Sequence, residues 1–265
     1  MFKYNRIIDI HGHIFPDKLA PKVVDTLENY YKMPWQKKGT VNDLIDSMNE
    51  ASVAKCVVFS TPTKPEQVTN VNDFLISNKD NDRFICFGSV HPGYEDYIGE
   101  IRRIKENGFK GFKFHPDFQY FYVDEPDMLK IYEEIGDQYP IIIHAGDKNT
   151  DYSSPYRFAN LLKLFPTHKF IAAHLGGYSE WDNAKEHLIG KNIYIDTSSV
   201  MTTLSIKETE EIIKLHGVDK VLFGTDYPAV SHKYELEKFL SMDFKKSEFN
   251  KMLYKNAEKL LKIRL

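Results

Sequence analysis

The 265-residue chain has few of the features that mark several common protein classes. It contains two cysteines, Cys56 and Cys86, each inside an apolar run, so we expect small buried side chains and no disulfide framework. It has no run of roughly 18 apolar residues, so no transmembrane helix is predicted. Asp9 and His11 interrupt the first apolar run, which therefore does not resemble a signal peptide. These absences predict a cytoplasmic protein without membrane contact.

The chain also lacks a large excess of either charge, since its net charge is −3 and its lysines and arginines are dispersed along the sequence. A nucleic-acid-binding protein would be expected to carry a basic patch, so no nucleic-acid partner is predicted. The hydrophobic fraction of 42% is ample for a sizeable core, and the charged fraction of 28% is ordinary for a globular protein. We expect a small-molecule partner, and a homodimer as the commonest default assembly.

Short apolar runs alternate eight times with stretches of helical periodicity, a pattern typical of βα units around a parallel sheet. Such strands are covered on both faces, which explains their near-continuous apolar character. A (β/α)8 barrel takes about 250 residues, so a single domain spanning residues 1–265 is predicted. The expected strands are Ile7–His13, Ala54–Ser60, Phe84–Val90, Gly111–His115, Ile141–His144, Phe170–His174, Ile193–Thr197 and Val221–Gly224.

The predicted helices lie between these strands, and extra helical material follows the first strand. The alternative fold, an open doubly wound sheet, would ordinarily show a glycine-rich phosphate turn after strand one. This chain has His11-Gly12-His13-Ile14-Phe15-Pro16 there, which favours the barrel. The insertion is expected as two helices, Asp17–Tyr31 and Val41–Ala51, joined by a loop that carries Trp35. The remaining helices are expected at Pro65–Asn78, Tyr94–Asn107, Asp127–Gln138, Tyr156–Leu164, Ser179–Leu188, Ile206–His216 and in two C-terminal segments ending in Lys246–Ile263.

Histidines gather at the carboxyl ends of the predicted strands. In a barrel these ends converge on one face, where barrel active sites lie. His11 and His13 share the parity of one strand, so both point to the same side and can bind one ion. Three histidines with a carboxylate suit zinc or a related divalent cation. The histidines in these positions are His11, His13, His91, His115, His144 and His174, and strand eight ends in Asp226.

Five motifs in this order resemble the amidohydrolase superfamily. They resemble in particular the amidohydrolase-related branch, which includes aminocarboxymuconate-semialdehyde decarboxylase and small metal-dependent hydrolases. The resemblance spans nearly the whole chain. The motifs are Asp9-Ile10-His11-Gly12-His13, Gly111–Pro116, Ile143-His144-Ala145-Gly146, Ala173-His174-Leu175-Gly176-Gly177 and Phe223-Gly224-Thr225-Asp226-Tyr227-Pro228.

The resemblance implies a ligand set for one metal ion. It identifies His11, His13, His144 and Asp226 as ligands, and His174 as a catalytic group that orients the metal-bound water or the substrate. Zn²⁺ is the expected ion, with Mn²⁺ or another divalent cation as the alternative. Asp9 lies lower in the strand, where we expect it to orient a histidine or to belong to the core.

The number of metal ions depends on Lys113. Binuclear members of the superfamily carry a carboxylated lysine on strand four, so two ions would bind if Lys113 is carboxylated. One ion is favoured, because the motif of Gly111–Pro116 also occurs in the mononuclear branch. There Lys113, with His115 at the same parity, would hold a substrate carboxylate.

The predicted function is metal-dependent hydrolysis of a small carboxylate-bearing amide, ester or lactone. A metal-activated water would attack, with Asp226 as general base and then acid. The alternative is a non-oxidative decarboxylase that uses the same site. Decarboxylases of this branch tend to be longer, and no arginine on an early loop is evident, which tilts the prediction toward hydrolysis. A non-catalytic scaffold is disfavoured because every expected ligand position is filled.

Overall fold

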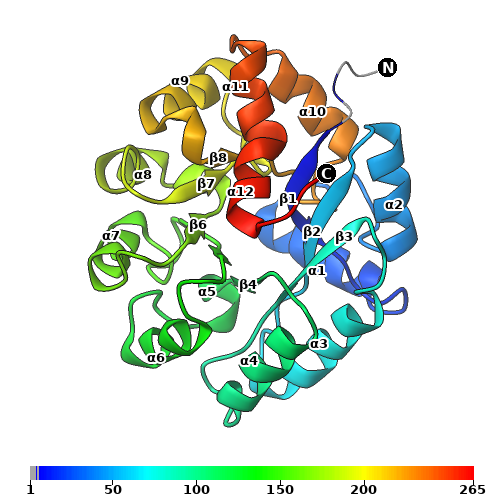
Figure 1. The fold of residues 1–265 in the computed structure, drawn as a ribbon, viewed down its shortest axis with the longest axis vertical. Coiled ribbons are helices and arrows are strands. Elements are labelled where there is room, and N and C mark those ends of the chain that lie inside the picture. The colour runs from blue at the N-terminus through cyan, green and yellow to red at the C-terminus, as the bar shows by residue number, and fades with distance from the viewer. Residues whose placement is uncertain (1–3, 5) are drawn as a thin grey trace.

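Eight parallel strands form the centre of the molecule in a computed structural model that describes residues 4 and 6–265. Each strand pairs with the next along the chain, in the order β1 to β8. Helices surround the strands as an outer ring (Figure 1). The strands are β1 (Ile8–His13), β2 (Lys55–Phe59), β3 (Phe84–Gly88), β4 (Gly111–Phe114), β5 (Ile141–Ile143), β6 (Phe170–Ala172), β7 (Tyr194–Asp196) and β8 (Val221–Leu222).

Backbone hydrogen bonds between β1 and the segment that follows β8 close the barrel. Ile10 N donates to Phe223 O over 2.9 Å, and Asp226 N donates to His11 O over 2.9 Å. A parallel bridge joins Gly12 to Tyr227 one step further on. The strand-eight aspartate is thereby fixed beside the first histidine motif. The predicted (β/α)8 barrel is confirmed.

The helices follow the strands in the expected order, with the insertion between β1 and β2. Helices α10, α11 and α12 lie beside β8 and β1 (Figure 1). The α-helices are α1 (Ala20–Tyr31), α2 (Val41–Glu50), α3 (Val68–Ser77), α4 (Tyr97–Glu106), α5 (Pro116–Gln119), α6 (Pro126–Ile135), α7 (Pro155–Leu164), α8 (Trp181–His187), α9 (Ile206–His216), α10 (His232–Leu240), α11 (Lys246–Asn250) and α12 (Asn256–Leu261).

The strands end earlier than the sequence pattern indicates. β5 ends at Ile143 and β6 at Ala172, so His144 and His174 fall in the turns that follow. The segment after β4 begins with the single helical turn of α5, because Pro116 at its first position is preset for helical φ. Within the described part of the chain, no helix is long and apolar enough to cross a bilayer.

The strands bury both of their faces, as the apolar runs predict. Every residue of β3, β4, β5 and β6 is buried, and Lys113 on β4 is among the largest fully buried side chains. Both cysteines are free and buried, as expected from their surroundings. The core is mainly apolar, and polar side chains gather at the carboxyl ends of the strands, where the candidate site lies.

Candidate metal centre

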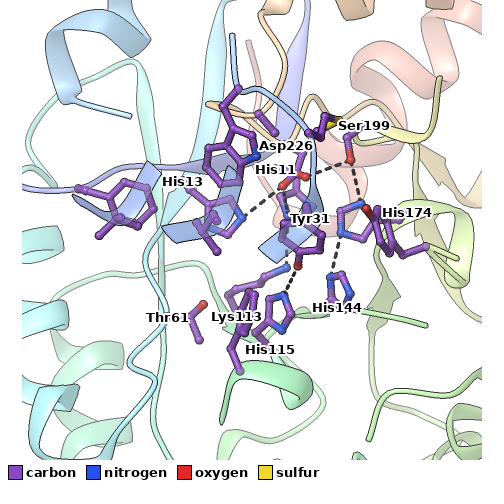
Figure 2. A pocket seen from close by; sticks show the side chains of 18 of the residues that line it. His11, His13, Tyr31, Thr61, Lys113, His115, His144, His174, Ser199 and Asp226 are labelled. Atoms are coloured by element: carbon purple, nitrogen blue, oxygen red, sulfur yellow. Dashed lines mark hydrogen bonds and ion pairs between the residues drawn. The ribbon is translucent and has the colours of Figure 1, made fainter. Parts of the chain in front are cut away.

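The predicted ligands meet at the carboxyl end of the barrel. His11 and His13 project from β1, His144 follows β5 directly, and His174 lies two residues after β6. Asp226 comes from the turn after β8. Figure 2 shows these side chains facing a common centre, and all of them line one pocket together with Lys113 and His115. The structure thus brings together the residues predicted as ligands, catalytic group and substrate-binding groups, whereas His91, also at a predicted strand end, does not line this pocket.

Several pairs of donor atoms in this site are spaced like two ligands of one ion. His11 Nε2 and His13 Nε2 lie 3.3 Å and 3.4 Å from Asp226 Oδ1. His174 Nε2 lies 3.1 Å from His144 Nδ1. Ligands on metal bonds of about 2.0–2.2 Å are roughly 3.0–3.5 Å apart in tetrahedral or octahedral geometry. These contacts match that spacing.

Three of these donors lie within mutual reach of one ion, and they include His174 but not the predicted ligands His13 and His144. His11, His174 and Asp226 each offer an atom within 4.8 Å of the other two. His144 adjoins this group through His174, and His13 adjoins it through Asp226. Neutral imidazoles with one carboxylate are donors that suit Zn²⁺ or Mn²⁺. The residues present therefore fit a divalent ion.

Asp196, the last residue of β7, contacts the ring of His11 at Nδ1, the nitrogen that faces away from the site. Its Oδ2 lies 2.9 Å from His11 Nδ1, and both side chains are fully buried. Its Oδ1 accepts a hydrogen bond from the backbone N–H of His174 over 3.0 Å. A proton held on Nδ1 leaves the lone pair of His11 on Nε2, the atom that faces the site. One carboxylate thus orients two of the site histidines.

His174 is oriented in the same way by backbone and hydroxyl groups. Its Nδ1 lies 2.9 Å from the carbonyl oxygen of Ser198, so the proton on this nitrogen has an acceptor. His174 and Asp226 both have left-handed backbone conformations, with φ of 57° and 64°. Such conformations are costly for residues other than glycine and often occur at functional sites.

Burial favours the neutral form of the imidazoles of His13, His115 and His144. It lowers the pKa of His13 to about 4 and shifts the pKa of His144 and His115 well below the ordinary value. Burial alone would raise the pKa of Asp226. The hydrogen bond from His13 and the positive charge that His11 and His174 can carry outweigh it and hold that pKa low. At neutral pH the site therefore offers imidazole lone pairs and one carboxylate.

Lys113 reaches the same centre from β4. Its ammonium is fully buried and lies 3.3 Å from His11 Nε2. Burial lowers its pKa to about 8, while the charges of Asp196 and Asp226 oppose the change. Among the described residues that line the pocket, Lys113 is the only lysine or arginine. It is the fixed positive charge available to an anionic ligand.

The first helix of the insertion covers the mouth of the pocket. Val23, Leu27 and Tyr31, spaced four residues apart along α1, all line the pocket. The Tyr31 hydroxyl lies 3.1 Å from His115 Nε2. The cavity beneath measures about 120 Å³, room for a small molecule.

Comparison with known proteins identifies the family. The family model described as "Amidohydrolase" matches residues 8–263. The chain belongs to the amidohydrolase family. The comparison with curated proteins finds no significant match. The resemblance inferred from the motifs is confirmed.

Solved structures share the fold across nearly the whole chain. An uncharacterised barrel protein from Bordetella bronchiseptica is 18% identical, with a TM-score of 0.77 over 97% of this chain and 98% of that one. 2,6-Dihydroxybenzoate decarboxylase from Rhizobium is 18% identical, with a TM-score of 0.73 over 98% and 99%. A dihydroxybenzoic acid decarboxylase from Polaromonas, solved with manganese and 2-nitroresorcinol, is 16% identical, with a TM-score of 0.75 over 98% and 97%.

Several residues of this amidohydrolase site were not predicted from the sequence. Asp196 had a signal, since it is a lone carboxylate at the end of an otherwise apolar predicted strand. Ser199, whose hydroxyl donates to Asp226 Oδ2 over 3.0 Å, had none that separates it from other turn serines. Tyr31 and Trp35 reach the pocket from the insertion, and no strand pattern fixes its placement.

Proposed function

We propose that this amidohydrolase is a metal-dependent, non-oxidative decarboxylase of a small carboxylic acid. The observation that carries the proposal is the charge pattern of the pocket. Among the described residues that line it, Lys113 is the one fixed cation and Asp226 the one carboxylate. The remaining walls are mainly apolar or aromatic, and include Phe15, Leu27 and Phe118. Such a pocket suits one small acid and one proton transfer.

The structural similarity favours loss of CO2 over hydrolysis. It extends over 97–99% of the two decarboxylase chains described above, so the argument from chain length against decarboxylation loses its support. The comparisons favour the alternative prediction over hydrolysis.

The metal ion would be held by His11, His13, His144 and Asp226, with His174 beside them. When bound, it would supply positive charge that binds a substrate oxygen and stabilises the negative charge that develops as CO2 leaves. Zinc and manganese both suit the donor set, and manganese is present in the Polaromonas decarboxylase structure.

The side chains of the pocket divide the remaining work. Lys113 attracts and orients the substrate anion. As the bond between the carboxylate carbon and its neighbour breaks, the electron pair stays on the neighbouring carbon and CO2 departs. That carbon takes up one proton, which Asp226 delivers after receiving it from solvent or from the substrate. Ser199, which donates to Asp226 Oδ2, fixes the direction of the carboxylate during this transfer.

One observation favours hydrolysis as the second candidate. The pKa of Asp226 is held low by His13, His11 and His174 despite burial, so the free site presents a carboxylate ready to accept a proton from water. In that reaction Asp226 acts as general base, His174 orients the attacking oxygen, and Lys113 holds a remote carboxylate of the substrate.

Product analysis separates the two reactions. The metal-loaded enzyme is incubated with a panel of small aromatic and unsaturated carboxylic acids, and with lactones, esters and N-acyl amino acids. Released CO2 is measured in parallel with acid production. Enzyme-dependent CO2 release that is lost in Asp226→Asn supports the proposal. Acid release from a lactone, ester or amide without CO2 assigns the site to hydrolysis instead.

A further inference from the structure

Four buried polar atoms of residues that line the pocket have no hydrogen-bond partner in the described part of the chain. His115 Nδ1 and His144 Nε2 belong to the histidine cluster, and the other two are Trp35 Nε1 and Thr61 Oγ1. An indole N–H can only donate, and a buried donor without an acceptor is unfavourable. Trp35 Nε1 and Thr61 Oγ1 are therefore suited to receive an acceptor from a bound molecule.

The Trp35 segment is held firmly in place. Its backbone N–H donates to Glu28 Oε1 on α1 over 2.6 Å. The next residue, Gln36, donates its N–H to Ala229 O over 3.1 Å, in the segment that follows Asp226. Trp35 therefore lies where the insertion contacts the segment that follows Asp226. A donor on such a fixed backbone loses little conformational entropy when it binds a ligand.

Thr61 approaches from another wall. It lies two residues after β2, and Figure 2 shows it on the opposite side of the site from Ser199 and His174. Neither Trp35 nor Thr61 carries charge. Phe15, Val23 and Met33, which line the same pocket, are apolar.

We propose that Trp35 and Thr61 form a neutral donor subsite that recognises an uncharged oxygen of the substrate, such as a hydroxyl, ether or carbonyl group. The proposal rests on the proposed function in one respect, that this pocket binds the substrate. A second carboxylate at these walls would be buried against neutral donors alone, which is unfavourable. The substrate class is then a small acid that carries a neutral oxygen substituent away from its metal-binding group.

The two tryptophans of the chain provide an internal control. Trp181 Nε1 already donates to the carbonyl oxygen of His174 over 3.1 Å. In protein labelled with ¹⁵N-tryptophan, each indole gives one N–H signal, and Trp35→Phe assigns them. A ligand oxygen bound by Trp35 should move the Trp35 signal downfield and leave the hydrogen bond of Trp181 in place.

The test uses matched probes on the zinc-loaded chain of 265 residues. 3-Hydroxybenzoate is compared with 3-methylbenzoate, and 4-hydroxybenzoate with 4-methylbenzoate, by NMR and by isothermal titration. In at least one pair the hydroxyl probe should bind about tenfold more tightly than its methyl partner and shift only the Trp35 signal. Trp35→Phe should remove most of this preference while the affinity of the methyl probe stays unchanged, and Thr61→Val should reduce it.

The proposal is overturned if no pair shows a preference for the hydroxyl probe, if Trp35→Phe leaves the preference intact, or if the Trp35 signal does not move. The Trp181 signal reports whether each variant is folded. These outcomes are independent of the reaction. If CO2 is released but the hydroxyl probe is not preferred, only the subsite proposal is rejected. If the hydroxyl probe is preferred but no CO2 is released, only the decarboxylase proposal is rejected.

Discussion

His11 Nδ1 and Asp196 Oδ2 lie 2.9 Å apart, and neither side chain is exposed to solvent. The same carboxylate accepts the backbone N–H of His174 through its other oxygen. Asp196 thus links β1 to the turn after β6. Its negative charge also favours the tautomer of His11 that carries the proton on Nδ1. The lone pair on Nε2 then stays free for a metal ion.

Asp196→Asn should weaken metal binding by about 10–100-fold, because the amide no longer favours the required tautomer of His11. Competition with a chromophoric chelator measures the dissociation constant. Asp182→Asn is the matched control, since the Asp182 side chain is fully exposed on α8. Unchanged metal affinity in Asp196→Asn, together with normal thermal stability, would show that Asp196 does not set the histidine geometry.

Asp226→Asn should reduce turnover by about 10²–10⁴-fold, since the amide cannot carry the proton. Much of the metal should remain bound, because three histidines stay in place. Turnover is followed by CO2 release and metal content by atomic absorption. Ser199→Ala should lower turnover by a smaller factor, as it removes only the hydroxyl that fixes Asp226. Turnover in Asp226→Asn that matches the wild type would rule out the proton-transfer role.

The barrel and the clustering of the candidate metal ligands were predictable because the relevant residues lie in the strand pattern itself. His11 and His13 share a strand parity, and His144, His174 and Asp226 follow apolar runs that can only be strands. Parallel strands in a barrel place such residues at one end. The exact ends of the strands were not predictable, because the apolar run continues into turns that the barrel buries, as at His144.

The residues that were missed act through contacts remote in sequence. Asp196 lies 185 residues from His11, and only the closed barrel brings them together. Tyr31 and Trp35 belong to an insertion whose amphipathic pattern predicts a helix but not the surface it covers. The substrate is harder still to predict, because it depends on a few unpartnered donor atoms and on the shape of the walls.

The rate with an anionic substrate should fall as pH rises through about 8, the pKa of the buried Lys113. The ammonium holds the substrate only while protonated, and a bound divalent cation would move the fall to lower pH by repulsion. Lys113→Met should raise KM by about tenfold or more and abolish this fall. The measurement is kcat/KM between pH 6 and 9.5. If Lys113→Met keeps the same alkaline fall, another group is responsible for it.

Metal analysis of the same pair addresses the number of ions. We expect about one equivalent in the wild type and in Lys113→Met, because the ligand set does not need the amine. Two equivalents in the wild type and one in the variant would indicate a carboxylated Lys113 that bridges two ions.

Tyr31→Phe should raise KM several-fold with little change in metal content. The hydroxyl lies 3.1 Å from His115 Nε2 and holds the end of α1 over the pocket. Without it the covering helix should be less well fixed, at a cost of about one hydrogen bond. Tyr156→Phe is the control, since the exposed Tyr156 hydroxyl donates to Asp151 and Tyr156 does not line the pocket. Equal KM values in both variants would exclude a positioning role for Tyr31.

Glu235 on α10 should make the protein less stable as pH rises. Its side chain is fully buried, and neither carboxylate oxygen has a hydrogen-bond partner in the described part of the chain. Burial raises its pKa well above the ordinary value of 4.5, and the charges of Asp9 and Asp226 raise it further, whereas Lys238 opposes them. The folded state therefore binds a proton that the unfolded state releases. The stabilisation is complete below pH 4.5 and is lost as pH rises toward the folded pKa.

Glu235→Gln removes this titration while keeping the size of the side chain. The free energy of unfolding of the variant minus that of the wild type should increase by up to about 1.4 kcal/mol per pH unit above pH 5. Urea unfolding of the metal-free proteins at pH 5, 6, 7 and 8 measures the difference. Glu237→Gln, an exposed position on the same helix, should follow the wild type at every pH. A constant difference between Glu235→Gln and wild type across this range would mean that Glu235 is ionised in the folded protein, and that a partner compensates its charge.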